Sequence, residues 1–217
     1  MRQGQTMWDN QGKQVALFPL SGFFISQPWW GTYSHEGGQR YYATDFIPVD
    51  DNGNRQYRQP CYAPCTIELL WLDRTECCSL WQSTMPVHFA DGSTDYLGII
   101  VYHDNDIENG NYSQIGDQKS QGEIFNRTGT GGNVTGDHVH LEVGKGQVLM
   151  SDNKFHFTDN TRCRRIVPDD VLFVNDTYVV PYERYNWKVF SEEPSFSTRK
   201  NDFPWHIIAN KIRKRRC

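Results

Sequence analysis

The sequence has no long hydrophobic run and no strong excess of charge. No stretch approaches the ~18 consecutive apolar residues of a membrane-spanning helix, and residues 1–10 lack the apolar segment of a secretory signal. We therefore expect a protein that stays in the cell that produces it, leaves by a route not encoded in this sequence, or has lost its signal. The net charge of -4 at pH 7 is too small to indicate a strongly acidic or nucleic-acid-binding protein as a whole.

The sequence lacks the paired Cys-x-x-Cys pattern of a zinc cluster, and its cysteines leave the redox setting ambiguous. The six cysteines are Cys61, Cys65, Cys77, Cys78, Cys163 and Cys217. A chain of 217 residues buries a core large enough to fold without disulfides. Thiols packed in the core, or one local disulfide, are therefore favoured over a cysteine metal cluster.

Turn formers and aromatic residues are abundant and predict a mainly β fold. The chain has 18 glycines, 14% aromatic residues and a mean hydropathy of -0.69, which is typical of short strands joined by long polar loops. We expect an antiparallel β-sheet core, followed by a C-terminal extension of short strands and irregular structure. The predicted division is an N-terminal arm over residues 1–16, a main domain over residues 17–146, and an extension or docking region over residues 147–217. The basic end, residues 211–216, is expected to be a solvated tail rather than a site for anionic polymers.

The most informative segment is residues 136–143, which read Gly-Asp-His-Val-His-Leu-Glu-Val. Apolar and polar residues alternate here, which predicts a strand whose successive side chains point to opposite faces. His138 and His140 then share a face, and a glycine-rich loop precedes them. Two imidazoles on one strand face can converge on a metal ion, or on a metal ion and its substrate. A single His-x-His pair also occurs by chance on exposed strands, so the rest of the chain decides between these interpretations.

Three further residues lie at positions suited to such a site. His35 lies in a glycine-rich loop, and Asp45 interrupts the apolar strand predicted over residues 41–49. A buried, unpaired carboxylate costs on the order of several kcal/mol, so Asp45 is expected either at an exposed sheet edge or beside a cation, a hydrogen-bond network or a metal. The most apolar run, residues 96–102, ends at His103. This histidine either serves a catalytic site on a rigid strand or opens a surface loop.

The order of these elements resembles the lysostaphin/LytM-type zinc endopeptidases, which cleave peptide cross-links of bacterial peptidoglycan. The similarity covers about residues 17–145, and its most specific part is the Thr-Gly-Asp-His-Val-His-Leu-Glu-Val segment at residues 135–143. Other matching segments are residues 18–20, 27–28, 34–37, 43–46, 62–64 and 102–103, and a hairpin predicted over residues 114–125.

The resemblance implies a zinc ion held by His35, Asp45 and His140, with His103 and His138 as catalytic imidazoles that do not bind the metal. A hydrolytic zinc site keeps one position open for water, so three protein ligands are expected. One of His103 and His138 would take the proton of the water or stabilise the oxyanion, and the other would protonate the leaving amine. The sequence leaves the order of these roles open.

The spacer between the first two implied ligands is longer than usual for the family. His35 and Asp45 lie ten positions apart instead of about four, so the residues between them must loop out. Phage-encoded relatives are similar in carrying longer spacers here. If the spacer moved Asp45 away, Asp50 or Glu36 could replace it, or the site could lack a metal.

The function that the resemblance implies is zinc-dependent hydrolysis of peptide cross-links in peptidoglycan by a phage-encoded enzyme. The enzyme would act as a tail-associated part of the virion or as a lysin released to the host cell wall, with residues 147–217 contacting other tail proteins. Loops 36–44 and 105–113 would shape the substrate groove, and neither a membrane nor nucleic acid is an expected partner. The alternatives are an inactive fold that serves as a structural or wall-binding module of a virion, and a zinc hydrolase acting on a peptide outside the wall.

Overall fold

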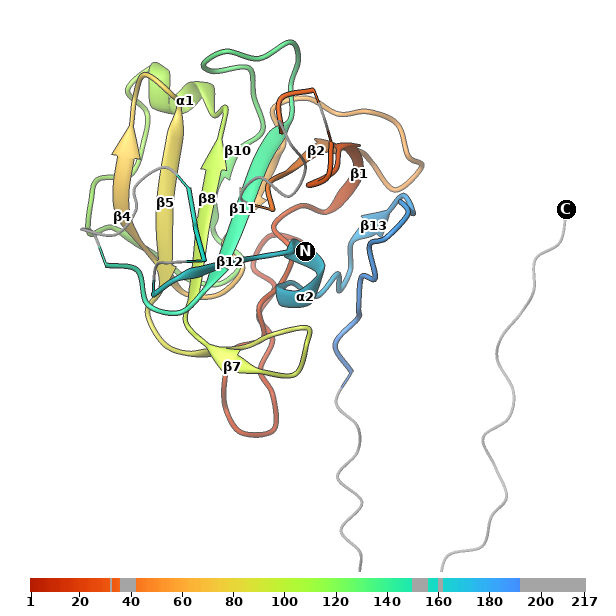
Figure 1. Cartoon of the computed structure of the whole chain (residues 1–217), viewed down its shortest axis with the longest axis vertical. Coiled ribbons are helices and arrows are strands. Elements are labelled where there is room, and N and C mark those ends of the chain that lie inside the picture. Colours follow the sequence, from red (N-terminus) through yellow and green to blue (C-terminus); the bar gives the residue numbers. More distant parts are fainter. Residues whose placement is uncertain (32, 36–41, 150–155, 160–161, 192–217) are drawn as a thin grey trace, which may run out of the picture.

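The computed structural model describes residues 1–31, 33–35, 42–149, 156–159 and 162–191 (Figure 1). The basic end at residues 211–216, Cys217 and Glu36 therefore lie outside the described residues. Within the described ranges, no helix has the length and apolar character of a membrane span.

A nine-stranded β-sheet organises the described chain. Its strands are β1 (Gly22–Gln27), β2 (Thr44–Pro48), β4 (Ile67–Asp73), β5 (Cys78–Ser83), β8 (Leu97–Tyr102), β9 (Gln118–Lys119), β11 (Val139–Lys145), β12 (Arg164–Ile166) and β13 (Tyr178–Val179). They lie in the order β13-β1-β2-β11-β8-β5-β4-β9, and β12 pairs with β11 outside this path. All neighbours are antiparallel except β13, which runs parallel to β1. The prediction of a mainly β fold with an antiparallel core is confirmed.

Two small sheets and two short helices complete the described structure. They are β3 (Pro60–Tyr62) with β10 (Ile124–Arg127), β6 (Val87–His88) with β7 (Thr94–Asp95), α1 (Asn105–Glu108) and α2 (Pro168–Val171). The hairpin predicted over residues 114–125 is wrong, because β9 pairs with β4 whereas β10 pairs with β3. The chain turns away at Gly122, whose N–H donates to the carbonyl of Ala63 at 3.0 Å, and the N–H of Ala63 donates to the carbonyl of Glu123 at 2.8 Å.

Strand β11 lies in the middle of the sheet, between β2 and β8 (Figure 1). Its apolar residues Val139, Leu141 and Val143 are fully buried and belong to the larger hydrophobic cluster, together with side chains of β1, β2, β5 and β8. Burying one such side chain stabilises a fold by ~1.5–3 kcal/mol. This burial fixes the strand's register, so that His138 and His140 face the opposite side, as the alternation predicted.

The register brings residues with reactive side chains next to one another. His140 lies opposite Asp45 on β2 and opposite Tyr102 on β8. Phe46 is buried in the larger cluster, so its neighbour Asp45 faces the same side of the sheet as His140. His103 follows directly after the last residue of β8. Three adjacent strands therefore carry candidate site residues to one region.

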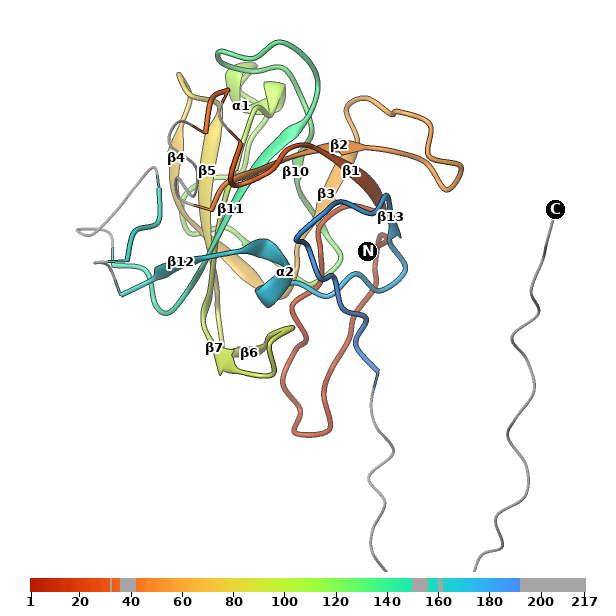
Figure 2. The ribbon, with the colours of Figure 1, turned by 45° about the vertical axis from the view of Figure 1, so that its right-hand side comes forward.

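The two ends of the described chain pack against each other and against the sheet. Figure 2 shows the first residues beside the segment that follows α2, where the amino group of Met1 donates to Oγ1 of Thr177 at 2.6 Å. Strands β12 and β13 pair with β11 and β1, and Phe157 belongs to a second hydrophobic cluster with Leu80 and Ile100. The division at residues 16 and 146 stays a prediction.

The cysteines of the described ranges all lie inside the protein. Cys61, Cys65, Cys77, Cys78 and Cys163 are all buried. Burial raises the pKa of the Cys163 thiol to about 12, so this thiol stays protonated at neutral pH. For these five residues the packing role predicted from the sequence is confirmed.

Candidate metal centre

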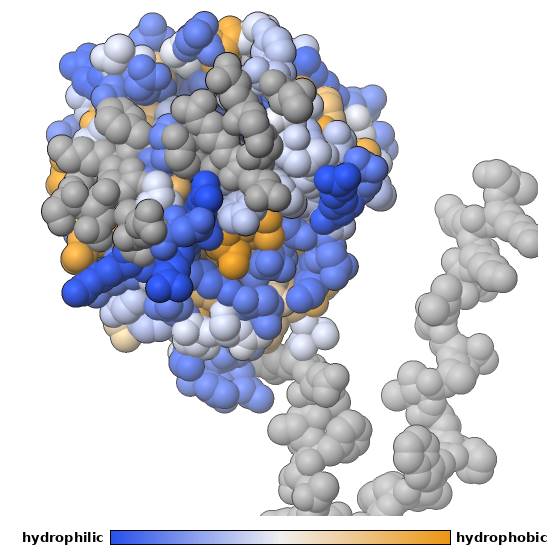
Figure 3. Space-filling view, in the orientation of Figure 1, coloured by the Kyte–Doolittle hydropathy of each residue, from blue (hydrophilic) through white to orange (hydrophobic). Residues whose placement is uncertain are grey.

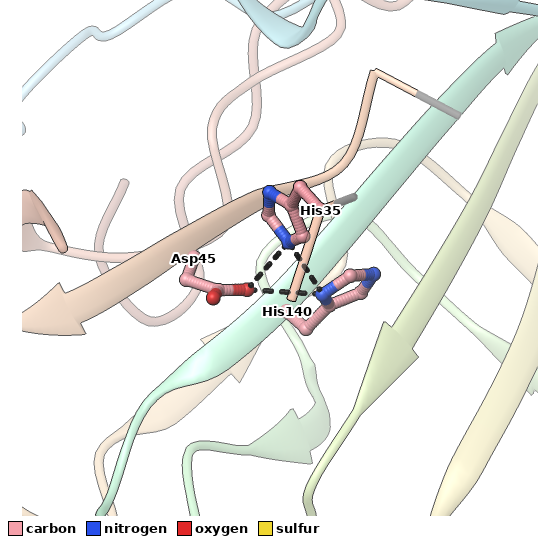
Figure 4. A group of neighbouring side chains, drawn as sticks. All are labelled: His35, Asp45 and His140. Carbon is pink, nitrogen blue, oxygen red and sulfur yellow. Dashed lines mark hydrogen bonds and ion pairs between the residues drawn. The ribbon is translucent and has the colours of Figure 1, made fainter. Parts of the chain in front are cut away.

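Three side chains from separate parts of the chain converge on one point (Figure 4). His35 comes from the loop after β1, Asp45 from β2 and His140 from β11. The distance from His140 Nδ1 to Asp45 Oδ1 is 2.9 Å, from His35 Nε2 to His140 Nδ1 3.4 Å, and from His35 Nε2 to Asp45 Oδ1 3.5 Å. Tetrahedral zinc with bonds of about 2.1 Å separates its ligand atoms by about 3.4 Å. The two distances from His35 match this separation, whereas the distance between His140 and Asp45 is that of a hydrogen bond. These are the three residues that the resemblance implied as ligands, and they could hold a metal ion.

Hydrogen bonds orient both imidazoles toward this point. Nδ1 of His35 donates to the carbonyl of Pro28 at 3.0 Å, so Nε2 is the nitrogen that could bind a metal. Nε2 of His140 donates to Oε1 of Glu142 at 3.3 Å, so Nδ1 is the nitrogen of this ring that could bind a metal. Such partners fix the tautomer and the ring orientation of metal-binding histidines.

The carboxylate of Asp45 is oriented in the same way. Nε2 of Gln27 donates to its Oδ2 at 2.9 Å, so Oδ1 is the oxygen that faces the two histidines. Asp45 is 8% exposed, and it therefore does not lie at an open sheet edge. Of the two possible substitutes, Asp50 uses its carboxylate within its own turn, where Oδ1 accepts hydrogen bonds from the backbone N–H groups of Asn52 and Asn54, and Glu36 lies outside the described residues.

The site strongly favours the ionised form of Asp45. Burial disfavours the carboxylate, but the interactions with His140 and His35 outweigh it and hold the pKa of Asp45 well below its usual range. Burial also disfavours the His140 cation, yet Asp45 and Glu142 raise the pKa of His140 to about 9. In the metal-free protein at neutral pH, Asp45 and His140 therefore form an ion pair at the position where a metal would bind.

The two other predicted histidines lie beside the triangle. Nδ1 of His138 donates to the carbonyl of Gly136 at 2.8 Å, and its Nε2 is 3.8 Å from Asp45 Oδ1. Nδ1 of His103 donates to the carbonyl of Gly131 at 3.0 Å. The rings of His103 and His138 are 4.6 Å apart between centroids. Because a carbonyl can only accept, both residues keep Nε2 as the nitrogen that exchanges protons.

The backbone of His103 is held in an unusual conformation. Its φ of 82° lies where non-glycine residues rarely occur, at a cost of ~1–3 kcal/mol. The N–H of His103 donates to the carbonyl of Cys77 at 2.9 Å, and its carbonyl accepts from the N–H of Gly131 at 3.0 Å. Burial and the neighbouring charges of His138 and His140 lower the pKa of His103 to about 3, so the imidazole is neutral at physiological pH.

The triangle lies in a groove of about 880 Å³. Besides the five predicted residues, its lining includes Tyr33, Glu76, Tyr102, residues 133–137 and His156. The structure corrects one expectation, since loop 105–113 does not line this groove. It contributes to a separate cavity of about 430 Å³ with Trp81 and Phe125, because Asp104 caps α1 and accepts a hydrogen bond from Arg127 N at 2.7 Å.

Two residues of the centre were missed by the sequence analysis. Glu142 is fully buried and lies two positions after His140, so the same alternation that paired the histidines could have placed it on their face. His156 hydrogen-bonds Glu142 from the segment beyond β11, and no local sequence pattern predicts this contact.

On the face shown in Figure 3, hydrophilic residues predominate among the coloured atoms and apolar residues form small separate patches.

No protein-family model matches the chain. The chain is 31% identical over 182 residues to Morphogenesis protein 1 of Bacillus phage B103, a match that covers 82% of the chain and 45% of that protein. The chain thus spans less than half the length of this relative.

Solved structures similar to the chain include peptidases of the type that the sequence resembles. One is the catalytic domain of a prophage-encoded M23 protein from Enterococcus faecalis (17% identity, 64% of this chain and 90% of that chain, TM-score 0.41). Others are the catalytic domain of lysostaphin from Staphylococcus simulans (14%, 60% and 83%, TM-score 0.36) and a zinc-containing peptidase from Vibrio cholerae (12%, 64% and 42%, TM-score 0.38).

Proposed function

We propose that the chain is a zinc-dependent endopeptidase that hydrolyses peptide cross-links of bacterial peptidoglycan. The observation that carries the proposal is the triangle of His35, Asp45 and His140, whose three facing atoms are 2.9–3.5 Å apart. Two neutral nitrogens and one carboxylate oxygen are a ligand set that hydrolytic zinc sites use. Bound there, zinc would polarise a peptide carbonyl and activate water.

The residues around the triangle supply the proton transfers. Nε2 of His138 lies beside Asp45 Oδ1, and the neutral ring of His103 packs against the ring of His138. We assign to this pair the removal of the proton from water and its delivery to the leaving amine, the order of the two remaining open. Positioned acid and base groups typically contribute ~10²–10⁴-fold each to a rate.

A phage setting is supported by the similarity to a phage morphogenesis protein. We propose that the protein acts on the host cell wall, either as a tail-associated component of the virion or as a released lysin. Contacts of residues 147–217 with other tail proteins belong to the same proposal. The alternative is an inactive fold that serves as a structural or wall-binding module, and against it stands the retention of all five imidazole and carboxylate positions.

Mass spectrometry of digested peptidoglycan tests the proposal. The zinc-loaded protein should release fragments with new amino termini, and a chelator should stop the release. His138→Ala should lower the rate by ~10²–10⁴-fold with zinc still bound, because His138 is not one of the three ligands. His88→Ala is the matched control, since His88 also hydrogen-bonds a carboxylate, that of Asp9, at 3.0 Å and lies outside the groove. Wall binding without new amino termini would favour the inactive module.

A further inference from the structure

The buried carboxylate of Glu142 connects the metal centre to the chain beyond β11. Its Oε1 accepts hydrogen bonds from Nε2 of His140 at 3.3 Å and from Nδ1 of His156 at 2.5 Å. Its Oε2 accepts one from the N–H of Phe157 at 3.2 Å. Glu142 is 0% exposed, so these groups replace the water that the carboxylate loses on folding.

The ring of His156 is also packed against the wall of the centre. It stacks on the ring of Tyr102 at 6.1 Å between centroids, with 19° between the planes. Tyr102 in turn meets the ring of His140 edge-on at 4.9 Å. The His156 side chain is 30% exposed and lines the groove, so it touches both the support of His140 and the space for substrate.

We propose that His156 is a positioning residue of the metal centre, acting on His140 through Glu142. With His156 in place, Glu142 is fixed where it accepts the Nε2 proton of His140, so that Nδ1 of His140 faces the metal position. This inference rests on the proposed zinc site. It also means that part of the segment predicted as a docking region, residues 147–217, completes the centre.

Loss of the His156 bond would leave Glu142 with one side-chain donor, His140, at the longer distance of 3.3 Å. The carboxylate could then rotate, and His140 would lose its fixed orientation. Removing the direct outer partner of a metal-binding histidine typically weakens metal affinity by about 10–100-fold. Here that partner is Glu142, and we expect the loss of His156, which acts through Glu142, to fall within this range. The effect should appear in zinc affinity first, because His156 does not contact the three ligand atoms.

Three substitutions separate the hydrogen bond from the packing. His156→Ala removes both, and His156→Phe keeps a ring on Tyr102 but has no N–H for Glu142. His156→Asn places an amide N–H two bonds from Cβ, where Nδ1 stands in histidine, and should restore the bond. His88→Ala again serves as control.

The readouts are the zinc dissociation constant, from competition with a chromophoric chelator, and the visible absorption of the cobalt(II)-substituted full chain. We expect the Ala and Phe variants to bind zinc about 10–100-fold more weakly with an altered cobalt spectrum, and the Asn and His88→Ala variants to resemble the unsubstituted chain. Denaturation of each metal-free variant identifies any variant that fails to fold. If His156→Ala does not fold, the comparison of His156→Phe with His156→Asn tests the role of the hydrogen bond.

The two levels of the proposal fail differently. Unchanged zinc affinity in the Ala and Phe variants would overturn the role of His156 and leave the zinc site intact, as would loss of affinity in the Asn variant to the level of Phe. Absence of zinc binding by the unsubstituted chain would overturn the proposed function, and this inference with it.

Discussion

Zinc binding to the metal-free protein should release a proton that belongs to His140. Without metal, both nitrogens of this ring face carboxylate oxygens, Asp45 Oδ1 at 2.9 Å and Glu142 Oε1 at 3.3 Å. Both nitrogens therefore carry hydrogen, and the pKa of His140 rises from 6.5 to about 9 despite burial. Zinc can bind Nδ1 only after its proton has left, so binding and deprotonation are coupled.

The size of the release follows from the pKa. At pH 8, a group with a pKa of about 9 is about 90% protonated, whereas a histidine of ordinary pKa is about 3% protonated. We expect about 0.9 proton to leave His140 per zinc at pH 8, and the apparent zinc affinity to rise close to tenfold per pH unit from pH 7 to pH 8. Isothermal titration calorimetry in buffers of different ionisation enthalpy measures the total proton release as a slope, to which a zinc-bound water with a pKa of about 7 would add; the share of His140 is the part that Glu142→Gln removes.

A release below about 0.2 proton at pH 8 would refute the reasoning. Glu142→Gln provides an internal check, because the amide removes the charge that helps to raise the pKa of His140 and should reduce the release.

The ion pair of Asp45 and His140 also makes the stability of the metal-free protein depend on pH. The raised pKa of His140 stabilises the fold below pH 6.5, and this contribution, at most ~3 kcal/mol, is lost as the pH rises through about 9. The lowered pKa of Asp45 stabilises the fold above pH 3.8 and is lost as the pH falls.

Two substitutions away from the ligands test the packing that holds the site. Leu141→Ala should lower the free energy of unfolding by ~2–5 kcal/mol, because Leu141 is fully buried. Urea denaturation measures this loss, with Met85→Ala as the exposed control. A loss below about 1 kcal/mol would contradict the burial of Leu141. Gly129→Ala should lower kcat with little change in zinc affinity. A Cβ at position 129 would lie 2.2 Å from the carbonyl oxygen of His103, so the substitution must displace His103. Unchanged kinetics would show that the loop of Gly129 does not position His103.

Much of the centre could be predicted because its residues lie in regular strands. Period-two alternation predicted that His138 and His140 share a face, since successive side chains of a strand point to opposite faces and Leu141 points to the buried one. Asp45 was anticipated because a carboxylate inside an apolar strand needs a partner. The contact of His35 with these residues was predicted only from the resemblance, since no local sequence pattern indicates a contact across about a hundred positions.

The failures lie where tertiary contacts override local pattern. Two glycines suggested a hairpin over residues 114–125. The backbone at Gly122 and Glu123 instead hydrogen-bonds the backbone of Ala63. The strand alternation puts Glu142 on the face of the two histidines, but it does not indicate that this carboxylate is fully buried. Its carboxylate hydrogen-bonds His156, fourteen positions away, and no periodicity in the sequence connects these two residues.

The position of a bound metal tests the central claim most directly. Crystals of the zinc-loaded full chain, measured at the zinc absorption edge, should give one strong anomalous peak per chain. The account predicts that it lies about 2.0–2.2 Å from His35 Nε2, Asp45 Oδ1 and His140 Nδ1. A peak at another cluster, or one that Asp45 does not reach, would contradict it.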